Sequence, residues 1–178
     1  MGSHINGDSA GGPAPAEAEA QSILDAIREI VRVLRESSRA AEAKVGLSGA
    51  QLFVLQKLGE GGPLSLNELA ARTLTHQSSV SVVVSRLVEA GLVQRRRAED
   101  DARRLELALT RQGEQLLSRA PDAAQERLIQ GVRELSATDR KRLAQGLKRL
   151  LERMGVEERT PEMFFEEPPK AKGKGSHG

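Results

Sequence analysis

The sequence predicts a mainly α-helical fold that contains one β-hairpin, and three observations support this class. Apolar residues recur at the helical spacing of about 3.6 residues in successive segments between residues 17 and 154. The stretch 105–109 instead alternates apolar residues with others, as a half-buried strand does. Of the 178 residues, 38% are hydrophobic and 29% are charged, which suits one compact domain or a small module with additional helices.

The composition excludes several classes of function. Cysteine is absent, which excludes disulfides, thiolate metal sites and cysteine nucleophiles. His76 is the one histidine outside the two ends of the chain, so a zinc site cannot be assembled, and we expect no metal and no cofactor. One histidine and scattered carboxylates form no catalytic constellation, so we expect no enzyme. With three phenylalanines and no tryptophan or tyrosine, stacking on single-stranded bases is also disfavoured.

The two ends of the chain have the composition of flexible tails. Residues 1–16 and 157–178 contain few apolar side chains, except for the run 163–165 (Met-Phe-Phe), which could dock on the body. The first 22 residues lack the pattern of a secretory signal, and no stretch approaches the roughly 18 apolar residues that cross a bilayer. We therefore expect a cytoplasmic protein with no membrane partner.

Three helices are expected before residue 75. The first spans about 17–44, ends at Gly46, and has its apolar side chains on one stripe. The second, 48–60, begins at the N-cap residue Ser48 and ends at the Glu-Gly-Gly-Pro breaker. The third spans 66–74. Their inner residues are Ile23, Ile27, Ile30, Val31 and Leu34, then Leu52, Phe53, Leu55 and Leu58, then Leu66, Leu69, Ala70 and Leu74.

The segment 77–90 decides the interpretation, and two structures compete for it. Its β-branched run could form a strand. A helix is favoured because the apolar stripe continues through Leu87 and Val88 to a stop at Gly91, where alternation fails. The helix has poor intrinsic propensity, so it must depend on packing. Its inner stripe is Val80, Val83, Val84, Leu87 and Val88, and its outer face is Ser78, Ser81, Val82 and Ser85, with Gln77 at the start.

A hairpin and two further helices complete the order. Residues 92–97 and 103–109 form the two strands around a polar loop, with Leu105, Leu107 and Leu109 turned inward. Thr110 caps a helix over about 111–134, either continuous or divided near Pro121. A capping box at 136–139 opens the last helix, which runs to about 154.

Three short helices followed directly by a hairpin have the order of a winged helix-turn-helix, in which the third helix enters the major groove of DNA. Residues 66–97 contain five Arg and two Glu, a local charge of 5 − 2 = +3, which suits a reader of polyanions. A solvated face would show the same serines, and Arg86 could pair with Glu89 instead of a phosphate. The DNA-contacting residues expected on this helix are His76, Gln77, Ser78, Ser79, Ser81, Val82, Ser85 and Arg86.

The hairpin carries five arginines that a narrow minor groove would attract. The other reading is an ordinary hairpin whose arginines pair with the acids of its loop, 99–101. DNA is favoured because the hairpin follows a groove-reading helix. The candidates on the hairpin are Arg95, Arg97, Arg103 and Arg104.

From Leu47 to Gly113 the residues resemble the MarR-type transcriptional regulators. Most specific are Asp101-x-Arg103 and Leu107-x-Leu109-Thr110-x-x-Gly113, which are similar to the wing signature of that family. The resemblance implies a homodimer on a palindromic operator, usually a repressor released by a small effector. It also implies that Arg103 enters the minor groove and that Asp101 orients it.

A dimer has separate support, because the outer helices carry more apolar surface than a winged domain can cover. The alternative is a monomer whose outer helices cover one another. The expected interface residues are Ile23, Ile27, Val31, Leu128, Leu143, Leu147, Leu150 and Leu151. The expected division is a tail (1–16), a dimerisation helix (17–46), a winged domain (47–110), two dimerisation helices (111–156) and a tail (157–178).

A second class of function remains open at this stage. The winged fold also serves as a protein-interaction module, in which the third helix contacts a partner protein and there is no operator.

Overall fold

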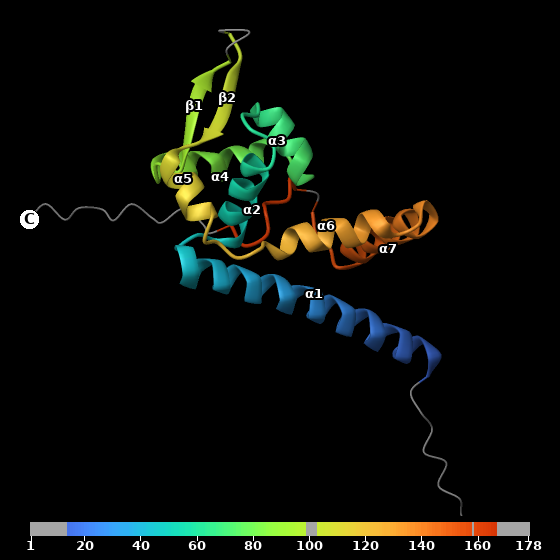
Figure 1. Cartoon of the computed structure of the whole chain (residues 1–178). Coiled ribbons are helices and arrows are strands. Elements are labelled where there is room, and N and C mark those ends of the chain that lie inside the picture. Colours follow the sequence, from blue (N-terminus) through green and yellow to red (C-terminus); the bar gives the residue numbers. More distant parts are fainter. Residues whose placement is uncertain (1–13, 99–102, 158, 167–178) are drawn as a thin grey trace, which may run out of the picture. The chain divides into compact units, whose positions relative to one another are not determined.

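The computed structural model describes residues 14–98, 103–157 and 159–166 (Figure 1). These residues form two units that divide between Val33 and Leu34, so the first holds the N-terminal half of the first helix. The elements are α1 (Pro15–Val45), α2 (Gly49–Gly59), α3 (Leu66–Thr73), α4 (Gln77–Glu89), β1 (Val93–Arg97), β2 (Leu105–Leu109), α5 (Arg111–Leu117), α6 (Ala124–Glu134) and α7 (Ala137–Arg153). The predicted class, mainly helical with one hairpin, is confirmed.

The boundaries of these helices follow from local chemistry. Gly46 has a φ of +71°, a left-handed conformation that glycine adopts without strain, and α1 ends there. Ser48 and Ser65 open α2 and α3 as capping boxes, each accepting a hydrogen bond from a backbone amide three residues on. The segment 77–90 is a helix, so the competing strand is excluded, and Gly91 follows it with a φ of +70°.

The predicted segment 111–134 is divided at Pro121 into α5 and α6. The Gln56 side chain of α2 holds the intervening backbone, because its amide nitrogen donates to the Pro121 carbonyl (2.9 Å) and its oxygen accepts from the Ala123 amide (3.2 Å). Proline cannot supply the amide that a continuous helix would need at this point. The linker is therefore fixed to the core and does not extend α5.

Helix α2 lies at the centre of the core and is buried on nearly every side. Around it pack α3, α4, α5, α6 and β2 (Figure 1). α4 contributes four buried side chains to the same cluster, so its valine stripe supplies the packing that its low helix propensity requires. The buried apolar residues of the two helices are Ala50, Leu52, Phe53, Val54, Leu55 and Leu58, then Val80, Val83, Val84 and Leu87.

The hairpin pairs β1 with β2 in antiparallel register, Val93 opposite Leu109 and Arg97 opposite Leu105. The backbone of Leu64 bonds with Leu107 and ties β2 to the loop before α3. The predicted inward set is only partly correct, because Leu105 is 60% exposed. It lies near the tip, beyond the helices that could cover it.

Thr110 connects the base of the hairpin to the helices on either side. Its hydroxyl donates to the Gly91 carbonyl at the end of α4 (2.7 Å) and accepts from the Gly113 amide at the start of α5 (3.1 Å). The Thr110 amide donates to the Leu92 carbonyl (3.0 Å). The predicted N-cap role of Thr110 is confirmed, and the same residue joins α4, β1 and α5.

The chain after α7 returns to the body, so residues 159–166 do not form the free tail that their composition suggested. Met163 is 6% exposed and belongs to the core cluster, so the run 163–165 docks through Met163, whereas Phe164 is 54% exposed. Residues 167–178 and 1–13 lie outside the described part of the chain.

We predict that Gly113→Ala destabilises the fold by about 1–3 kcal/mol, because it overpacks a contact with backbone. A Cβ at this position would lie 2.2 Å from the Leu92 carbonyl oxygen, which cannot move without displacing β1. Gly131→Ala is the matched control, since nothing lies within 4 Å of its Cβ. That variant should instead gain about 0.5–1 kcal/mol from helix propensity. Thermal unfolding measures both, and equal melting temperatures would contradict the assigned contact.

Candidate nucleic-acid interface

Helix α4 presents a polar face on the side opposite its buried valines. Gln77 and Ser78 are exposed, Val82 is 46% exposed, and Ser81 and Ser85 are half-buried. Short polar side chains on an exposed helix can approach base edges closely, and an apolar one can meet a thymine methyl group. The structure therefore places these five predicted residues on or beside one accessible face.

The start of α4 is also accessible. His76 is its N-cap and is exposed, and its side chain forms no capping hydrogen bond. The first amides of a helix carry partial positive charge and suit a phosphate oxygen. This position is compatible with the backbone contact predicted for His76.

Ser79 and Arg86 differ from the sequence prediction. Ser79 is buried, and its hydroxyl donates to the Pro161 carbonyl at 2.8 Å, so it does not lie on the accessible face. Ser79 precedes the buried Val83 by four residues, so it lies on nearly the same side of the helix, at the edge of the core. Arg86 is half-buried, and its Nη1 lies 3.5 Å from Glu166 Oε1, so its acidic partner is Glu166 and not the Glu89 considered from sequence.

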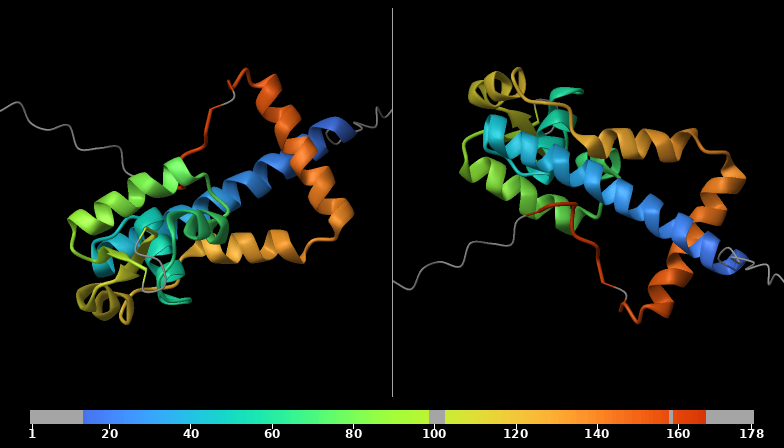
Figure 2. Two further views of the ribbon diagram at one scale, coloured as in Figure 1. Left: turned by 90° about the horizontal axis from the view of Figure 1, so that it is seen from above. Right: turned by 90° about the horizontal axis from the view of Figure 1, so that it is seen from below.

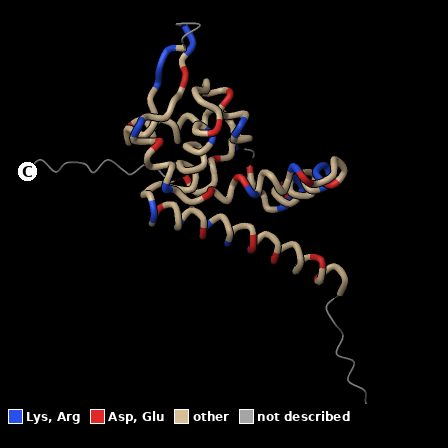
Figure 3. Tube along the Cα trace, in the orientation of Figure 1, with Lys and Arg blue, Asp and Glu red and all other residues tan. Residues whose placement is uncertain are grey.

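The hairpin carries several arginines, whose positions are blue in Figure 3, and the arginines of β1 are exposed. Arg95 Nη2 donates to Ser85 Oγ at 3.3 Å, which links β1 directly to α4. Arg97 ends β1, and Arg103 and Arg104 precede β2; all three are exposed. The predicted residue Asp101 lies outside the described residues.

Glu106 is a buried acid on β2 that the sequence pattern did not single out. It is 8% exposed and lies opposite Arg96 in the strand register. Its carboxylate is 3.7 Å from Arg96 Nε and 3.2 Å from Arg104 Nη2. These ion pairs hold the side chains of Arg96 and Arg104 along the hairpin. The sequence alternative was that hairpin arginines pair with the acids 99–101; the pairing seen among the described residues is with Glu106 instead. The sequence could have indicated this pairing, because the expected hairpin register places Glu106 opposite Arg96.

A sequence model of the MarR family matches residues 45–104. The chain contains a MarR-family domain. The match covers α2, α3, α4 and β1, and it confirms the resemblance from Leu47 to Arg104; the Leu107–Gly113 part of the wing signature lies beyond it.

Three known proteins are similar to this chain. The transcriptional repressor MdtR of Bacillus subtilis is 37% identical over 71 residues, 40% of this chain and 46% of MdtR. The transcriptional regulator FarR of Neisseria gonorrhoeae is 27% identical over 113 residues, 64% of this chain and 77% of FarR. Sco3205, a MarR-family regulator of Streptomyces coelicolor solved in complex with DNA, has a TM-score of 0.51 at 24% identity, over 82% of this chain and 92% of that one. The similarity to Sco3205 shows that the two chains share a fold, which is a winged helix.

The predicted interface residues differ in exposure. Leu143, Leu147, Leu150 and Leu151 are all exposed, and α7 buries no residue. Ile23 is exposed, whereas Ile27 and Val31 are half-buried. Leu128 is half-buried and lines a pocket with Phe53 and Met163, so the returning chain covers part of it.

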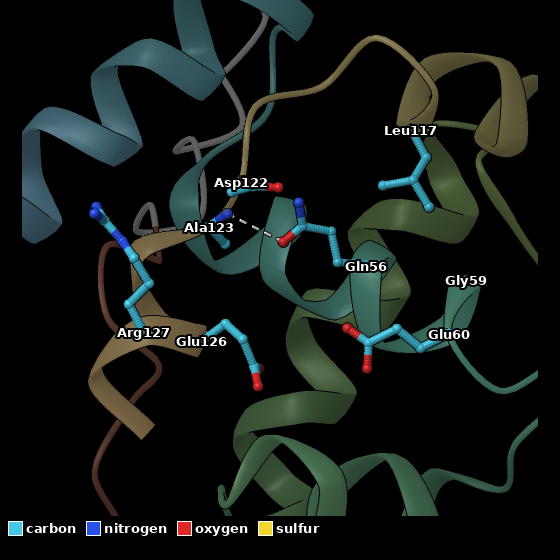
Figure 4. Close-up of a pocket in the computed structure, with 8 residues that line it drawn as sticks. All are labelled: Gln56, Gly59, Glu60, Leu117, Asp122, Ala123, Glu126 and Arg127. Atoms are coloured by element: carbon cyan, nitrogen blue, oxygen red, sulfur yellow. Dashed lines mark hydrogen bonds between the residues drawn. The ribbon is translucent and has the colours of Figure 1, made fainter. Parts of the chain in front are cut away.

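Beside the MarR-family domain, a pocket of about 680 Å³ lies between α2 and the start of α6 (Figure 4). Next to it, buried Lys57 pairs with Glu60 (2.9 Å) and Glu126 (2.5 Å), and its Nζ lies 5.7 Å from the centre of the Phe53 ring. Burial lowers the pKa of Lys57, but hydrogen bonds with Glu126 and Glu60 outweigh that effect and raise the pKa above its ordinary value. The ammonium therefore stays charged and links α2 to α6.

No cluster of three or more metal-binding side chains occurs among the described residues. No described helix is long and apolar enough to cross a membrane.

We predict that Lys57→Met destabilises the fold by about 1–3 kcal/mol, because it leaves the Glu126 carboxylate partly buried without its cation. Adding Glu126→Gln should recover part of the loss, since it removes the uncompensated charge. Exposed Lys44→Met is the control and should be close to neutral. Urea unfolding gives each value. A double variant as unstable as the sum of the two single variants would refute the coupling.

Proposed function

We propose that this protein is a sequence-specific regulator of transcription that binds double-stranded DNA as a homodimer on a palindromic operator. One observation carries the proposal: the accessible polar face of α4 lies beside an arginine-bearing hairpin, and the Arg95–Ser85 contact joins the two. Such a pair can read base edges in the major groove with α4 while arginines engage phosphates or the minor groove. MdtR is named as a repressor and Sco3205 was solved with DNA, which supports the same assignment.

The candidate contact residues divide between two tasks. Gln77, Ser78, Ser81, Val82 and Ser85 are proposed to face bases or nearby sugar. His76 and the hairpin arginines Arg95, Arg97, Arg103 and Arg104 are proposed to engage the backbone or minor groove, with Asp101 orienting Arg103.

The homodimer is proposed from exposed apolar surface. The four leucines of α7 form a stripe two turns long or more that no described residue buries. Exposed stripes of this kind are normally interfaces. A two-fold axis would then present two α4 helices to successive major grooves, about one helical turn of DNA apart.

We further propose that the regulator is a repressor that a small effector releases from DNA. An open cavity of about 1260 Å³ between α7 and residues 155–157 and 159–161 is large enough for such a ligand, and Leu147 and Leu151 contribute apolar surface to it. The effector must bind one arrangement of the dimer more tightly than another, because equal affinity shifts no equilibrium. Since an operator lies on the chromosome, we place the protein in the cytoplasm, and we propose no enzymatic activity for it.

The proposal is tested by titrating the genomic DNA that flanks the gene with protein over a series of salt concentrations. Binding through arginine–phosphate contacts must weaken steeply with salt, with a slope of about −0.9 for each phosphate neutralised. Footprinting on the same DNA should show a protected site with two-fold symmetry. Absence of binding at low salt would favour the protein-interaction module instead.

We predict that Arg103→Ala weakens DNA binding by about tenfold or more, as loss of a groove-bound arginine costs about 1–3 kcal/mol. Fluorescence anisotropy with the footprinted site measures the affinity. Arg119→Ala is the control, because Arg119 is also an exposed arginine but lies in the α5–α6 linker. Equal affinities for the two variants would remove Arg103 from the interface.

We predict that Leu147→Glu converts the dimer to monomer, because it buries a charge within the apolar stripe of α7. Gln145→Glu makes the same change in charge two residues earlier, on the opposite side of the helix, and should leave the dimer intact. Sedimentation velocity distinguishes the two masses. A dimer that persists in Leu147→Glu would place the interface elsewhere.

A further inference from the structure

Residues 159–166, which we name the C-terminal strap, run back from α7 and lie alongside α4 (Figure 2). The strap has the sequence Arg-Thr-Pro-Glu-Met-Phe-Phe-Glu, so its two glutamates are Glu162 and Glu166. It is not part of the matched family region, 45–104.

One apolar side chain anchors the strap in the core. Met163 is 6% exposed, and it lines a pocket with Phe53, Thr73 and Leu128. Full burial of a methionine side chain contributes about 1.5–3 kcal/mol relative to exposure. Phe164, the next residue, is 54% exposed, so the anchor is a single side chain.

Backbone carbonyls of the strap accept hydrogen bonds from the helices beneath it. Ser79 Oγ of α4 donates to the Pro161 carbonyl at 2.8 Å, and Gln125 Nε2 of α6 donates to the Phe164 carbonyl at 3.1 Å. The Glu166 amide bonds back to the Met163 carbonyl at 3.2 Å and closes a turn. The strap is therefore fixed in register on the side of α4.

The strap also neutralises a cation beside the accessible face of α4. Arg86 Nη1 lies 3.5 Å from Glu166 Oε1, and Ser79 and Arg86 are seven residues apart, about two turns on one side of the helix. Exposed Val82 lies between them in the sequence. The strap consequently follows one edge of the surface proposed to enter DNA, and Arg95 contacts that surface at Ser85.

A helix with its side chains is about 10–12 Å across and the major groove is about 12 Å wide, so a peptide beside α4 does not fit into the groove with it. Glu162, the exposed acid of the strap, would in addition repel phosphates along the groove edge. Docking of the strap and full insertion of α4 are therefore mutually exclusive on this side of the helix.

The ion pair between Arg86 and Glu166 is weak enough to be released. The Glu166 side chain is 7% exposed, and its Oε1 has no hydrogen-bond partner among the described residues. Burial raises the pKa of Glu166, the charge of Arg86 opposes that rise, and Glu162 adds to it. A buried carboxylate held only by a long ion pair recovers little of its desolvation cost, so this end of the strap is weakly held.

We propose that the C-terminal strap is an autoinhibitory latch, which when docked keeps Arg86 from phosphate and α4 from full insertion, and when released raises the affinity for duplex DNA. The inference rests on the proposed function, since it requires that α4 bind DNA.

The test compares Met163→Asp with Phe164→Asp in the full chain. Both variants add one negative charge to the strap, but only the first places it in the core and expels the strap. Anisotropy with a labelled random-sequence duplex over a salt series measures affinity, and hydrogen exchange of residues 159–166 reports undocking. Met163→Ala, a milder change, serves if Met163→Asp does not fold.

We expect Met163→Asp to bind DNA about threefold to tenfold more tightly than the unmodified chain, with a salt slope steeper by about one because Arg86 is freed for a phosphate. Phe164→Asp should keep the unmodified slope. If the unmodified chain binds DNA and Met163→Asp, although undocked, matches it in affinity and slope, the latch is refuted and the proposed function stands. If neither chain binds at low salt, the proposed function fails and the latch with it.

Discussion

The burial of α2 is the constraint on which the other elements depend. Phe53, Leu52 and Leu55 are almost fully inaccessible to solvent, and the side chains of α3, α4, β2 and α5 surround them. Burial of apolar surface contributes about 25 cal/mol for each Å², so elements that could not hold their own conformation gain it from this contact. Helix α4, rich in β-branched valine, is the clearest case: the same stripe that stabilises it also fixes which face it turns outward. The proposed function is therefore a consequence of how the core is packed.

Periodicity was sufficient for the helices and insufficient for the hairpin. The apolar residues of α4 repeat at helical spacing over the whole segment, and only a helix places all of them on one buried face. The segment could therefore be assigned as a helix although its β-branched composition favoured a strand. Alternation in β2 predicted Leu105 inward and Glu106 outward, yet Leu105 is exposed and Glu106 is buried. A two-stranded ribbon that extends beyond the helices has no second layer over its tip. There, pairing of Glu106 with Arg96 and Arg104 decides the placement, and a local pattern carries no information about such pairs.

The accessible face of α4 was predictable, but its edge was not. Ser78, Ser81 and Val82 lie where a helical wheel puts them, opposite the buried stripe. Ser79 is on the same wheel close to these residues, and a contact with Pro161, 82 residues away in the chain, removes it from solvent. No spacing rule anticipates a partner at that separation. The sequence offered only one indication of this contact, the three consecutive apolar residues 163–165 in an otherwise polar end of the chain. They suggest that the segment docks on the body, but they do not indicate where.

The hydroxyl of Thr110 bonds at once to the last turn beyond α4 and to the first turn of α5, while its amide holds the strand that begins the hairpin. Tilting the hairpin against α4 would therefore break at least one of these hydrogen bonds, so Thr110 couples the orientation of the two elements. In the homodimer that we propose, this coupling would keep the footprint of each subunit on DNA constant. Operators with different distances between half-sites would then require a change in the arrangement of the two subunits.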